Sequence, residues 1–179
     1  NIVIPAAGAG SRFKPLYQEP KPYIKVDGIS MIALAVKTLD IPGTYHYILP
    51  ADELTEGVKE ELEQMTPGCT FHVIDYVTDG AVQSVLLLTE LINNEEELII
   101  ANCDQVMRWA SADALDRLRK FDGGLVTILD DNPKHSYALI ENNVVTKVVE
   151  KEVISNNALT GIHYWKQGKD FVNAGTRMM

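Results

Sequence analysis

The sequence predicts an α/β fold, in which a parallel or mixed β-sheet carries helices on both faces. Short apolar runs with the character of strands alternate along the chain with segments whose apolar residues recur at helical spacing. The chain has 179 residues, of which 46% are hydrophobic and 23% are charged. That composition is typical of a globular domain with a sizeable core, so we expect residues 1–179 to form one domain.

The expected strands of this sheet are short apolar runs bounded by turn-forming or charged residues. They are residues 1–5, 45–49, 70–75, 97–101 and 125–129. Ligands of open α/β sheets bind in the crevice at the carboxyl ends of the strands. The expected ligand face therefore consists of the loops that follow Pro5, Leu49, Asp75 and Ala101.

Helices are expected between these strands, because apolar residues there fall on one face of a helix. In residues 52–65 that face consists of Leu54, Val58, Leu62 and Met65. Residues 81–92 and 111–121 show the same periodicity, and we expect Ser111 to cap the second of these helices. A further helix is expected over residues 169–179.

Beyond residue 130 the pattern changes to consecutive strands, which predicts a β-rich extension of the same domain. Residues 137–141 and 144–150 have the character of two strands, and Asn142-Asn143 between them favours a tight hairpin turn. Residues 158–165 form another expected strand. We therefore expect a mixed sheet, mainly parallel in its first part, with a hairpin added to it.

The acidic balance of the chain excludes several classes of partner. The net charge of −9 argues against nucleic acid, whose recognition needs a basic face, and against an anionic membrane surface. No apolar run is long enough to span a bilayer, and no signal peptide is recognisable before the first strand. Cys69 and Cys103 lack the spacing of a zinc site, so we expect free thiols and a cytoplasmic location.

The turn after the first strand has residues suited to phosphate binding. Gly8 and Gly10 leave room for backbone N–H groups to approach phosphate oxygens, and Arg12 and Lys21 add positive charge. Two known phosphate motifs are excluded. Phe13 stands where a dinucleotide fingerprint requires a third glycine, and no Gly-Lys-Ser/Thr follows the turn. A purely structural turn remains the alternative.

Asp104 follows the apolar run 98–101 at the expected ligand face. A carboxylate there can hold Mg²⁺, which takes few protein ligands and completes its shell with phosphate oxygens and water. The alternative is a structural role, because aspartate often caps turns at the ends of strands. The residues alone leave both interpretations open.

Five further stretches of sequence form a specific combination. The first two are Pro5-Ala-Ala-Gly-Ala-Gly-Ser-Arg-Phe13 and Lys21-Pro-Tyr-Ile-Lys-Val-Asp-Gly28. The others are Ile99-Ile-Ala-Asn-Cys-Asp-Gln105, Val148-Val-Glu-Lys151 and Thr160-Gly-Ile-His-Tyr-Trp165. Together they resemble the signature of the sugar-phosphate nucleotidyltransferases, or nucleoside-diphosphate-sugar pyrophosphorylases, of the bacterial and phage branch linked to capsule and lipopolysaccharide sugars. The resemblance implies a three-layer α/β/α, Rossmann-like nucleotide-diphospho-sugar transferase fold with a mainly parallel sheet.

The resemblance also implies a role for each matching residue. The residues expected to bind the nucleotide are Ala6, Ala7, Gly8, Ala9, Gly10, Ser11, Arg12, Lys21, Pro50, Gly80 and Gln83. Those expected to bind the sugar phosphate are Glu150, Lys151 and Thr160, and Asp104 would be the ligand of the Mg²⁺ cofactor. Arg12, Lys21 and Lys151 would be catalytic. Arg12 would neutralise pyrophosphate, while the two lysines would align the α-phosphate and the attacking phosphate.

The implied reaction joins a nucleoside triphosphate and a sugar 1-phosphate to give a nucleotide sugar and pyrophosphate. Two alternatives stay open: a cytidylyltransferase acting on a phosphorylated amino alcohol, and a metal-dependent glycosyltransferase of the same fold. The expected partners are thus an NTP and a sugar phosphate, and assembly into a homo-oligomer is left open. In the family a second metal-binding carboxylate comes from a later Gly-Thr-Pro-Asp-like segment. No such segment precedes Met179, so we expect the C-terminal part of the family pattern to be absent.

Overall fold

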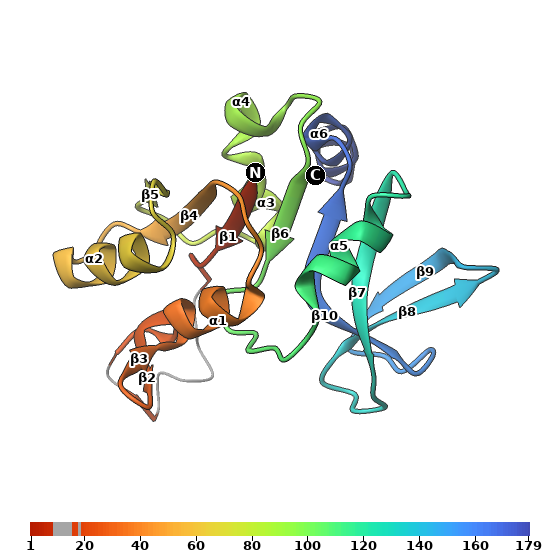
Figure 1. Ribbon diagram of the computed structural model, residues 1–179, viewed down its shortest axis with the longest axis horizontal. Coiled ribbons are helices and arrows are strands. Elements are labelled where there is room, and N and C mark those ends of the chain that lie inside the picture. The colour runs from red at the N-terminus through yellow and green to blue at the C-terminus, as the bar shows by residue number, and fades with distance from the viewer. Residues whose placement is uncertain (9–15, 18) are drawn as a thin grey trace.

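The computed structural model describes residues 1–8, 16–17 and 19–179, and within these ranges eight strands form one mixed sheet (Figure 1). The strands are β1 (Ile2–Pro5), β4 (Tyr45–Pro50), β5 (Thr70–Ile74), β6 (Leu98–Ala101), β7 (Gly123–Leu129), β8 (Ser136–Glu141), β9 (Val144–Glu150) and β10 (Asn157–Trp165). Their order is β5-β4-β1-β6-β10-β8-β9, and β7 pairs with β10. The predicted α/β fold class is confirmed.

The first four strands of this order are parallel. β1 pairs in parallel with both β4 and β6, and β4 pairs in parallel with β5. β10 then runs antiparallel to β6, β7 and β8, and the β8–β9 hairpin extends the sheet. The carboxyl ends of β1 and β6 therefore lie side by side at one edge of the sheet.

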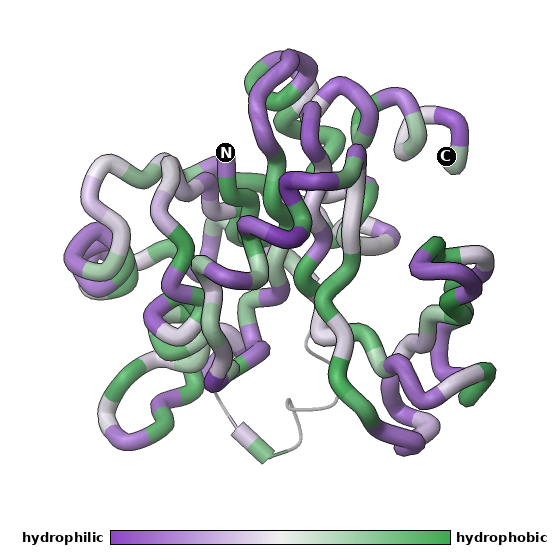
Figure 2. Tube along the Cα trace, turned by 45° about the vertical axis from the view of Figure 1, so that its right-hand side comes forward, coloured by the Kyte–Doolittle hydropathy of each residue, from purple (hydrophilic) through white to green (hydrophobic). Residues whose placement is uncertain are grey.

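Helices cover both faces of the sheet. One core contains residues of α1 (Met31–Leu39), α2 (Glu56–Met65) and α5 (Ser111–Leu118). The other contains residues of α3 (Ala81–Leu86), α4 (Thr89–Ile92) and α6 (Gly168–Met178). The strands serve both cores because side chains alternate between the faces: Ile2 and Ile4 belong to the first core and Val3 to the second. Figure 2 shows the hydrophobic residues along the central strands.

One helix was not expected from the sequence. α1 begins after Ser30, whose hydroxyl accepts a hydrogen bond from the N–H of Ala33 at 3.3 Å. It ends at Asp40, which has a left-handed backbone with φ 49°. The short elements before it, the turn η1 (Lys21–Tyr23) and the two-stranded hairpin of β2 (Lys25–Val26) and β3 (Ile29–Ser30), were also not expected. They are too short for hydrophobic periodicity to reveal.

Three of the helix predictions need correction. The helix expected over residues 52–65 begins only at Glu56, because the hydroxyl of Thr55 accepts from the N–H of Val58 at 3.4 Å and caps it there. The expected helix over residues 81–92 is divided into α3 and α4, because Leu87 and Leu88 form tighter i→i+3 hydrogen bonds and the Thr89 hydroxyl donates to the carbonyl of Leu86 at 2.6 Å. Ser111 is the first residue of α5 and not its cap. Its hydroxyl lies 3.4 Å from a carboxylate oxygen of Asp40, to which it donates.

The β-rich extension has the predicted hairpin. Asn142 and Asn143 connect β8 and β9 with φ values of 52° and 63°. These left-handed conformations suit asparagine and match the twist of a two-residue hairpin. The expected strand 158–165 is confirmed as β10, and the expected helix 169–179 as α6.

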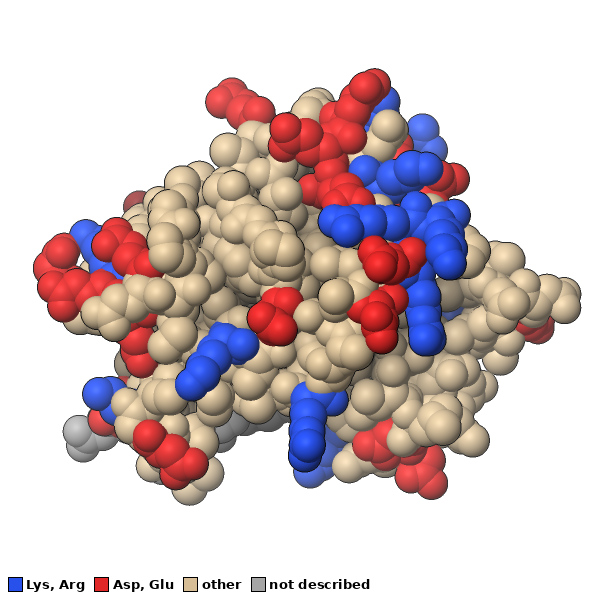
Figure 3. Space-filling view, in the orientation of Figure 1, with Lys and Arg blue, Asp and Glu red and all other residues tan. Residues whose placement is uncertain are grey.

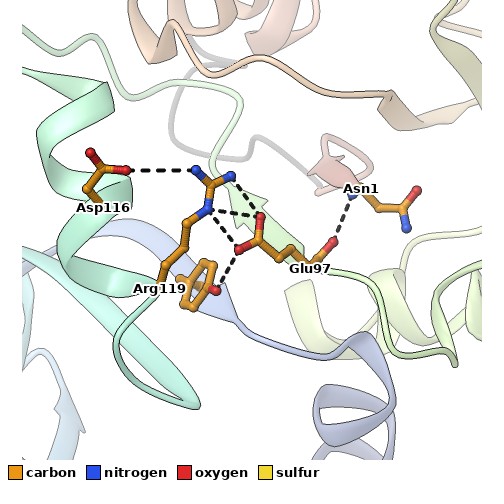
Figure 4. A network of polar contacts seen from close by, with 5 residues as sticks. Asn1, Glu97, Asp116 and Arg119 are labelled. Carbon is orange, nitrogen blue, oxygen red and sulfur yellow. Dashed lines mark hydrogen bonds and ion pairs between the residues drawn. The ribbon is translucent and has the colours of Figure 1, made fainter.

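A polar network joins three elements at the amino end of β6 (Figure 4). Arg119, at the end of α5, donates to both carboxylate oxygens of Glu97 at 2.9–3.2 Å. The hydroxyl of Tyr164 on β10 donates to the same carboxylate at 2.8 Å. The Arg119 hydrogen bond is the main cause of the lowered pKa of Glu97. This network fixes β6 at the end opposite to the expected ligand face.

The surface carries charges of both signs. On the face seen in Figure 3, lysine and arginine side chains near α5 and α6 are accompanied by aspartate and glutamate. None of the helices in the described part of the chain has both the length and the apolar character needed to cross a membrane.

Candidate active site

A cavity of about 260 Å³ opens at the carboxyl ends of β1 and β6. Ligands of open α/β sheets bind at this edge, in the crevice between neighbouring strands. The described residues that line the cavity are Pro5, Ala6, Gly8, Lys21, Pro22, Asn102, Cys103 and Asp104. Two separate segments thus meet here: the stretch that begins at β1 and continues to η1, and the turn after β6.

An ion pair joins these two segments across the cavity. The ammonium of Lys21 contacts the carboxylate of Asp104, and both side chains are partly exposed, at 26% and 30%. Lys21 is held by η1, in which the N–H of Tyr23 donates to the carbonyl of Pro20 at 2.9 Å and Pro22 is buried. A cation and a carboxylate therefore face the same solvent-accessible space.

The turn after β6 is held by the neighbouring strand β10. The N–H of Asn102 donates to the carbonyl of Gly161 at 3.2 Å. Gly161 has φ 78° and lies where the register of β10 shifts between Leu159 and His163. This register shift is a β-bulge, and it brings β10 against the site.

Cys103 lies between the two polar residues of this turn. Burial is the largest cause that raises the pKa of its thiol to about 12, and the charge of Asp104 adds to the effect. A thiol with that pKa stays protonated near neutral pH, and the thiolate is the nucleophilic form. Cys103 is therefore a packing residue and does not supply a nucleophile.

The expected nucleotide-binding residues fall into three groups. Ala6, Gly8 and Lys21 line the cavity. Ala7 is 1% exposed and packs in the second core. The others in this stretch lie outside the residues that the structure describes: Ala9, Gly10, Ser11 and Arg12. A Cβ on Gly8 would meet no described atom within 4 Å, so packing against the described residues does not require glycine there.

Three more residues expected at the nucleotide are not in the lining of this cavity. Pro50 is half-buried at the end of β4. Gly80 directly precedes α3, and the side-chain carbonyl of Gln83 accepts from the N–H of Asp79 at 2.5 Å. The structure thus places Pro50 at the carboxyl end of β4, and Gly80 and Gln83 at the start of α3, which follows β5.

The residues expected at the sugar phosphate lie in the β-rich extension. Glu150 ends β9, and its carboxylate pairs with the ammonium of Lys151. Lys151 has a left-handed backbone, and its N–H donates to the carbonyl of His135 at 3.1 Å. Thr160 is 2% exposed, and its hydroxyl donates to the carbonyl of Val126 at 2.9 Å. None of these three described residues lines the cavity.

Sequence reasoning missed Asn102 and Pro22 as residues of the site. Pro22 was quoted only as part of a motif, although it is buried and shapes η1 beneath Lys21. Asn102 could have been found from its position, because it is the first residue after a fully buried strand at the ligand face. Polar residues at that position are exposed to whatever the crevice binds.

The donor set fits a magnesium ion bound together with phosphates. Within the described ranges no three of the His, Cys, Asp and Glu side chains form a metal-binding group. Among the described residues that line the cavity, Asp104 supplies the carboxylate. Mg²⁺ is commonly held by one or two carboxylates with water and substrate phosphates. Asp104 is therefore the residue that would hold such an ion.

A mainly parallel sheet with a polar cavity at the carboxyl ends of its central strands defines an α/β protein that binds its ligand in the crevice. The chain belongs to the nucleotidyl transferase family, whose family model matches residues 1–172. Curated protein sequences contain no match to the chain.

Solved structures similar to the chain include three enzymes with different activities. A nucleoside-diphosphate-sugar pyrophosphorylase from Vibrio cholerae has a TM-score of 0.79, 21% identity, and covers 99% of this chain and 78% of its own. A putative glucose-1-phosphate thymidylyltransferase from Bacillus anthracis has a TM-score of 0.76 and 23% identity. The match covers 96% of this chain and 72% of that enzyme. An inositol-1-phosphate CTP transferase from T. maritima has a TM-score of 0.71 and 18% identity. The match covers 95% of this chain and 71% of that enzyme. These likenesses establish the fold.

Proposed function

We propose that the protein transfers a nucleotidyl group from a nucleoside triphosphate to a sugar 1-phosphate. The observation that carries the proposal is the convergence of Lys21 and Asp104 with the turn after β1 on one cavity. A triphosphate bound with a divalent cation presents both anionic oxygens and a metal. The cavity offers a cationic side chain for the first and a carboxylate for the second.

In the proposed reaction an oxygen of the sugar phosphate attacks the α-phosphorus of the NTP. A new P–O bond forms there, and the bond to the β-phosphate oxygen breaks, so that pyrophosphate leaves with its electron pair. The attacking phosphate is already anionic, so the protein needs no strong general base. Its work is positioning and stabilisation of charge.

Each proposed residue has a part in that work. Lys21 lies beside the cavity and would align the α-phosphate. Asp104 would hold Mg²⁺, which supplies charge neutralisation to the phosphates when bound. Arg12, assigned from sequence, would hold the leaving pyrophosphate. Glu150 and Lys151 at the end of β9 would bind the sugar hydroxyls and the attacking phosphate.

The activities of two of the similar structures support a sugar phosphate as acceptor. These two name a glucose 1-phosphate or nucleoside-diphosphate-sugar activity. A second candidate is transfer of a cytidylyl group to a phosphorylated alcohol that is not a sugar, because another neighbour is an inositol-1-phosphate CTP transferase. Both candidates use the same cavity and the same chemistry.

The biological setting is part of the proposal. A nucleotide sugar made in this way would serve as an activated donor for polysaccharide synthesis, as the capsule and lipopolysaccharide branch suggests. The unpaired thiols of Cys69 and Cys103 are consistent with a reducing compartment such as the cytoplasm. The described residues that line the cavity all come from one chain, so the proposed site neither requires nor excludes assembly into a homo-oligomer.

A pyrophosphate-release assay tests the function directly. The protein is incubated with Mg²⁺, with each of ATP, CTP, GTP, UTP and dTTP, and with one acceptor at a time. The acceptors are glucose, mannose and N-acetylglucosamine 1-phosphates, inositol 1-phosphate and phosphocholine. Release with a sugar 1-phosphate alone supports the proposal, and release only with inositol phosphate or phosphocholine supports the second candidate. A glycosyltransferase would instead liberate a nucleotide from a nucleotide sugar and yield no pyrophosphate.

A further inference from the structure

The side chain of Asn102 is an unassigned polar group in the candidate active site. Asn102 is the first residue after β6, and it lines the cavity together with Lys21 and Asp104. Its backbone is fixed, because its N–H donates to the carbonyl of Gly161. Its side-chain amide is exposed and forms no hydrogen bond with the described residues. As far as the described residues go, the donor and the acceptor of the amide are therefore both available to a ligand.

The side-chain amide of Asn102 packs directly against the backbone of Gly161. A Cβ on Gly161 would stand 2.0 Å from the Nδ2 atom and 2.5 Å from the Cγ atom of Asn102. Real Cβ contacts are not that short, so any other residue at position 161 would displace the amide. The left-handed backbone at position 161, with φ 78°, is a second and independent reason for glycine there. The bulge in β10 thus supports one side of the Asn102 amide.

We infer that Asn102 binds a hydroxyl group on the sugar of the acceptor and so contributes to acceptor specificity. This inference rests on the proposed function. A carboxamide donates and accepts at once, as a hydroxyl does. It carries no charge, and phosphate oxygens are better served by Lys21 in the same cavity. The neutral part of the substrate is therefore the part that suits Asn102.

The topology decides between the acceptor and the nucleotide. β6 lies between β1 and β10 in the sheet. The turn after β1 carries the residues expected at the nucleotide, whereas Asn102 contacts Gly161 on β10. The segment that begins at Thr160 is the one expected near the sugar. Asn102 consequently borders the side of the crevice that is left for the acceptor.

Steady-state kinetics of two Asn102 variants test the inference. Asn102→Ala removes the amide, and Asn102→Leu keeps comparable bulk against Gly161 without hydrogen-bonding atoms. Asn173→Ala, on the exposed side of α6, is the matched control. The acceptor is the hexose 1-phosphate that the native protein uses best. This acceptor and its monodeoxy analogues are each titrated at saturating NTP, and the NTP is titrated at saturating acceptor. Thermal unfolding confirms that each variant is folded.

We expect both Asn102 variants to raise the KM of the acceptor about tenfold, in line with a lost hydrogen bond, and to leave the KM of the NTP within about twofold. One monodeoxy analogue should be about tenfold poorer than its parent with the native protein and about equal to it with the variants. The inference is overturned if the variants match Asn173→Ala, if both KM values rise together, or if phosphocholine is the preferred acceptor. If the native protein releases no pyrophosphate with any acceptor, the proposed function itself fails, and the inference fails with it.

Discussion

The ammonium of Lys21 and the carboxylate of Asp104 form an ion pair between two segments that are far apart in the sequence. Both side chains also line the cavity at the end of β1 and β6. The pair links η1 to the turn after β6. A triphosphate bound with a divalent cation would offer each group a new counter-charge, phosphate for Lys21 and the metal for Asp104. The pair thus joins the two halves of the proposed site.

We expect Asp104→Asn to abolish metal-dependent turnover without unfolding the protein. Loss of the metal-binding charge should slow pyrophosphate release by about 100-fold or more, because metal stabilisation of phosphoryl charge contributes several kcal/mol. The free energy of unfolding should change by less than about 1 kcal/mol, since the pair with Lys21 is partly exposed. Magnesium titrations of activity and urea denaturation measure the two effects. Asp113→Asn, in the exposed first turn of α5, is the control. Near-normal turnover in folded Asp104→Asn would remove Asp104 from the metal role.

We expect Lys151→Ala to raise the KM of the phosphorylated acceptor by about tenfold or more, while the KM of the NTP changes little. The reason is its proposed charge-assisted contact with the attacking phosphate. Lys151 has φ 56°, so Lys151→Asn provides a second variant that tolerates this backbone. Lys147→Ala, exposed on β9 just before Lys151 in the chain, is the matched control. Initial rates measured against each substrate separate the effects. An equal rise of both KM values would contradict an acceptor role.

We expect Gly161→Ala to lower the free energy of unfolding by about 2 kcal/mol. The left-handed backbone costs an alanine about 1–2 kcal/mol, and the new methyl group displaces the Asn102 amide. Gly57→Ala is the control, and we expect it to change the free energy of unfolding in the opposite direction. Gly57 lies in α2, where a Cβ meets no described atom within 4 Å, so alanine should stabilise by about 0.5–1 kcal/mol. Urea denaturation measures both variants.

A double-mutant cycle separates the two costs at Gly161. Adding Asn102→Ala to Gly161→Ala should restore part of the lost stability, because the clash disappears while the backbone cost remains. Strict additivity of the two substitutions would show that the methyl group does not meet the amide.

We expect the protein to lose stability as the pH falls from about 6.5 toward 4, partly through His46. Burial is the largest cause that lowers the pKa of His46 from 6.5 to about 4, and the neighbouring His72 adds to it. Below pH 6.5 the unfolded chain therefore binds a proton that the folded chain does not accept until about pH 4. The contribution of His46 to the free energy of unfolding is fully present above pH 6.5. It declines as the pH falls through this window, by at most about 3 kcal/mol.

Urea denaturation at pH 7.5, 6 and 5 tests this dependence. His46→Gln should flatten the loss of stability between pH 6.5 and 5, and His135→Gln, at the partly exposed pair with Asp130, should leave most of it. An unchanged slope in His46→Gln would show that His46 does not contribute.

Much of the architecture could be predicted from the sequence, because the signals are local. The apolar run at Ile2–Pro5, the alternation of strands and helices, and the Asn142-Asn143 turn each depend on residues close together in the chain. The same is true of the chemistry at single positions. Lys21 and Asp104 were both identified as charged candidates without knowledge of their contact.

Only the tertiary structure decided which of these residues share a site. The pairing of β1 with β6 brings Lys21 to Asp104, and the pairing of β6 with β10 brings Gly161 under Asn102. It also leaves Lys151 outside the cavity lining, at the end of a separate hairpin. Strand order and register depend on packing between distant segments, which no local pattern records. The sequence by itself therefore determined the elements and the kinds of chemistry, whereas the fold determined their arrangement, because long-range contacts form only when the whole core is assembled.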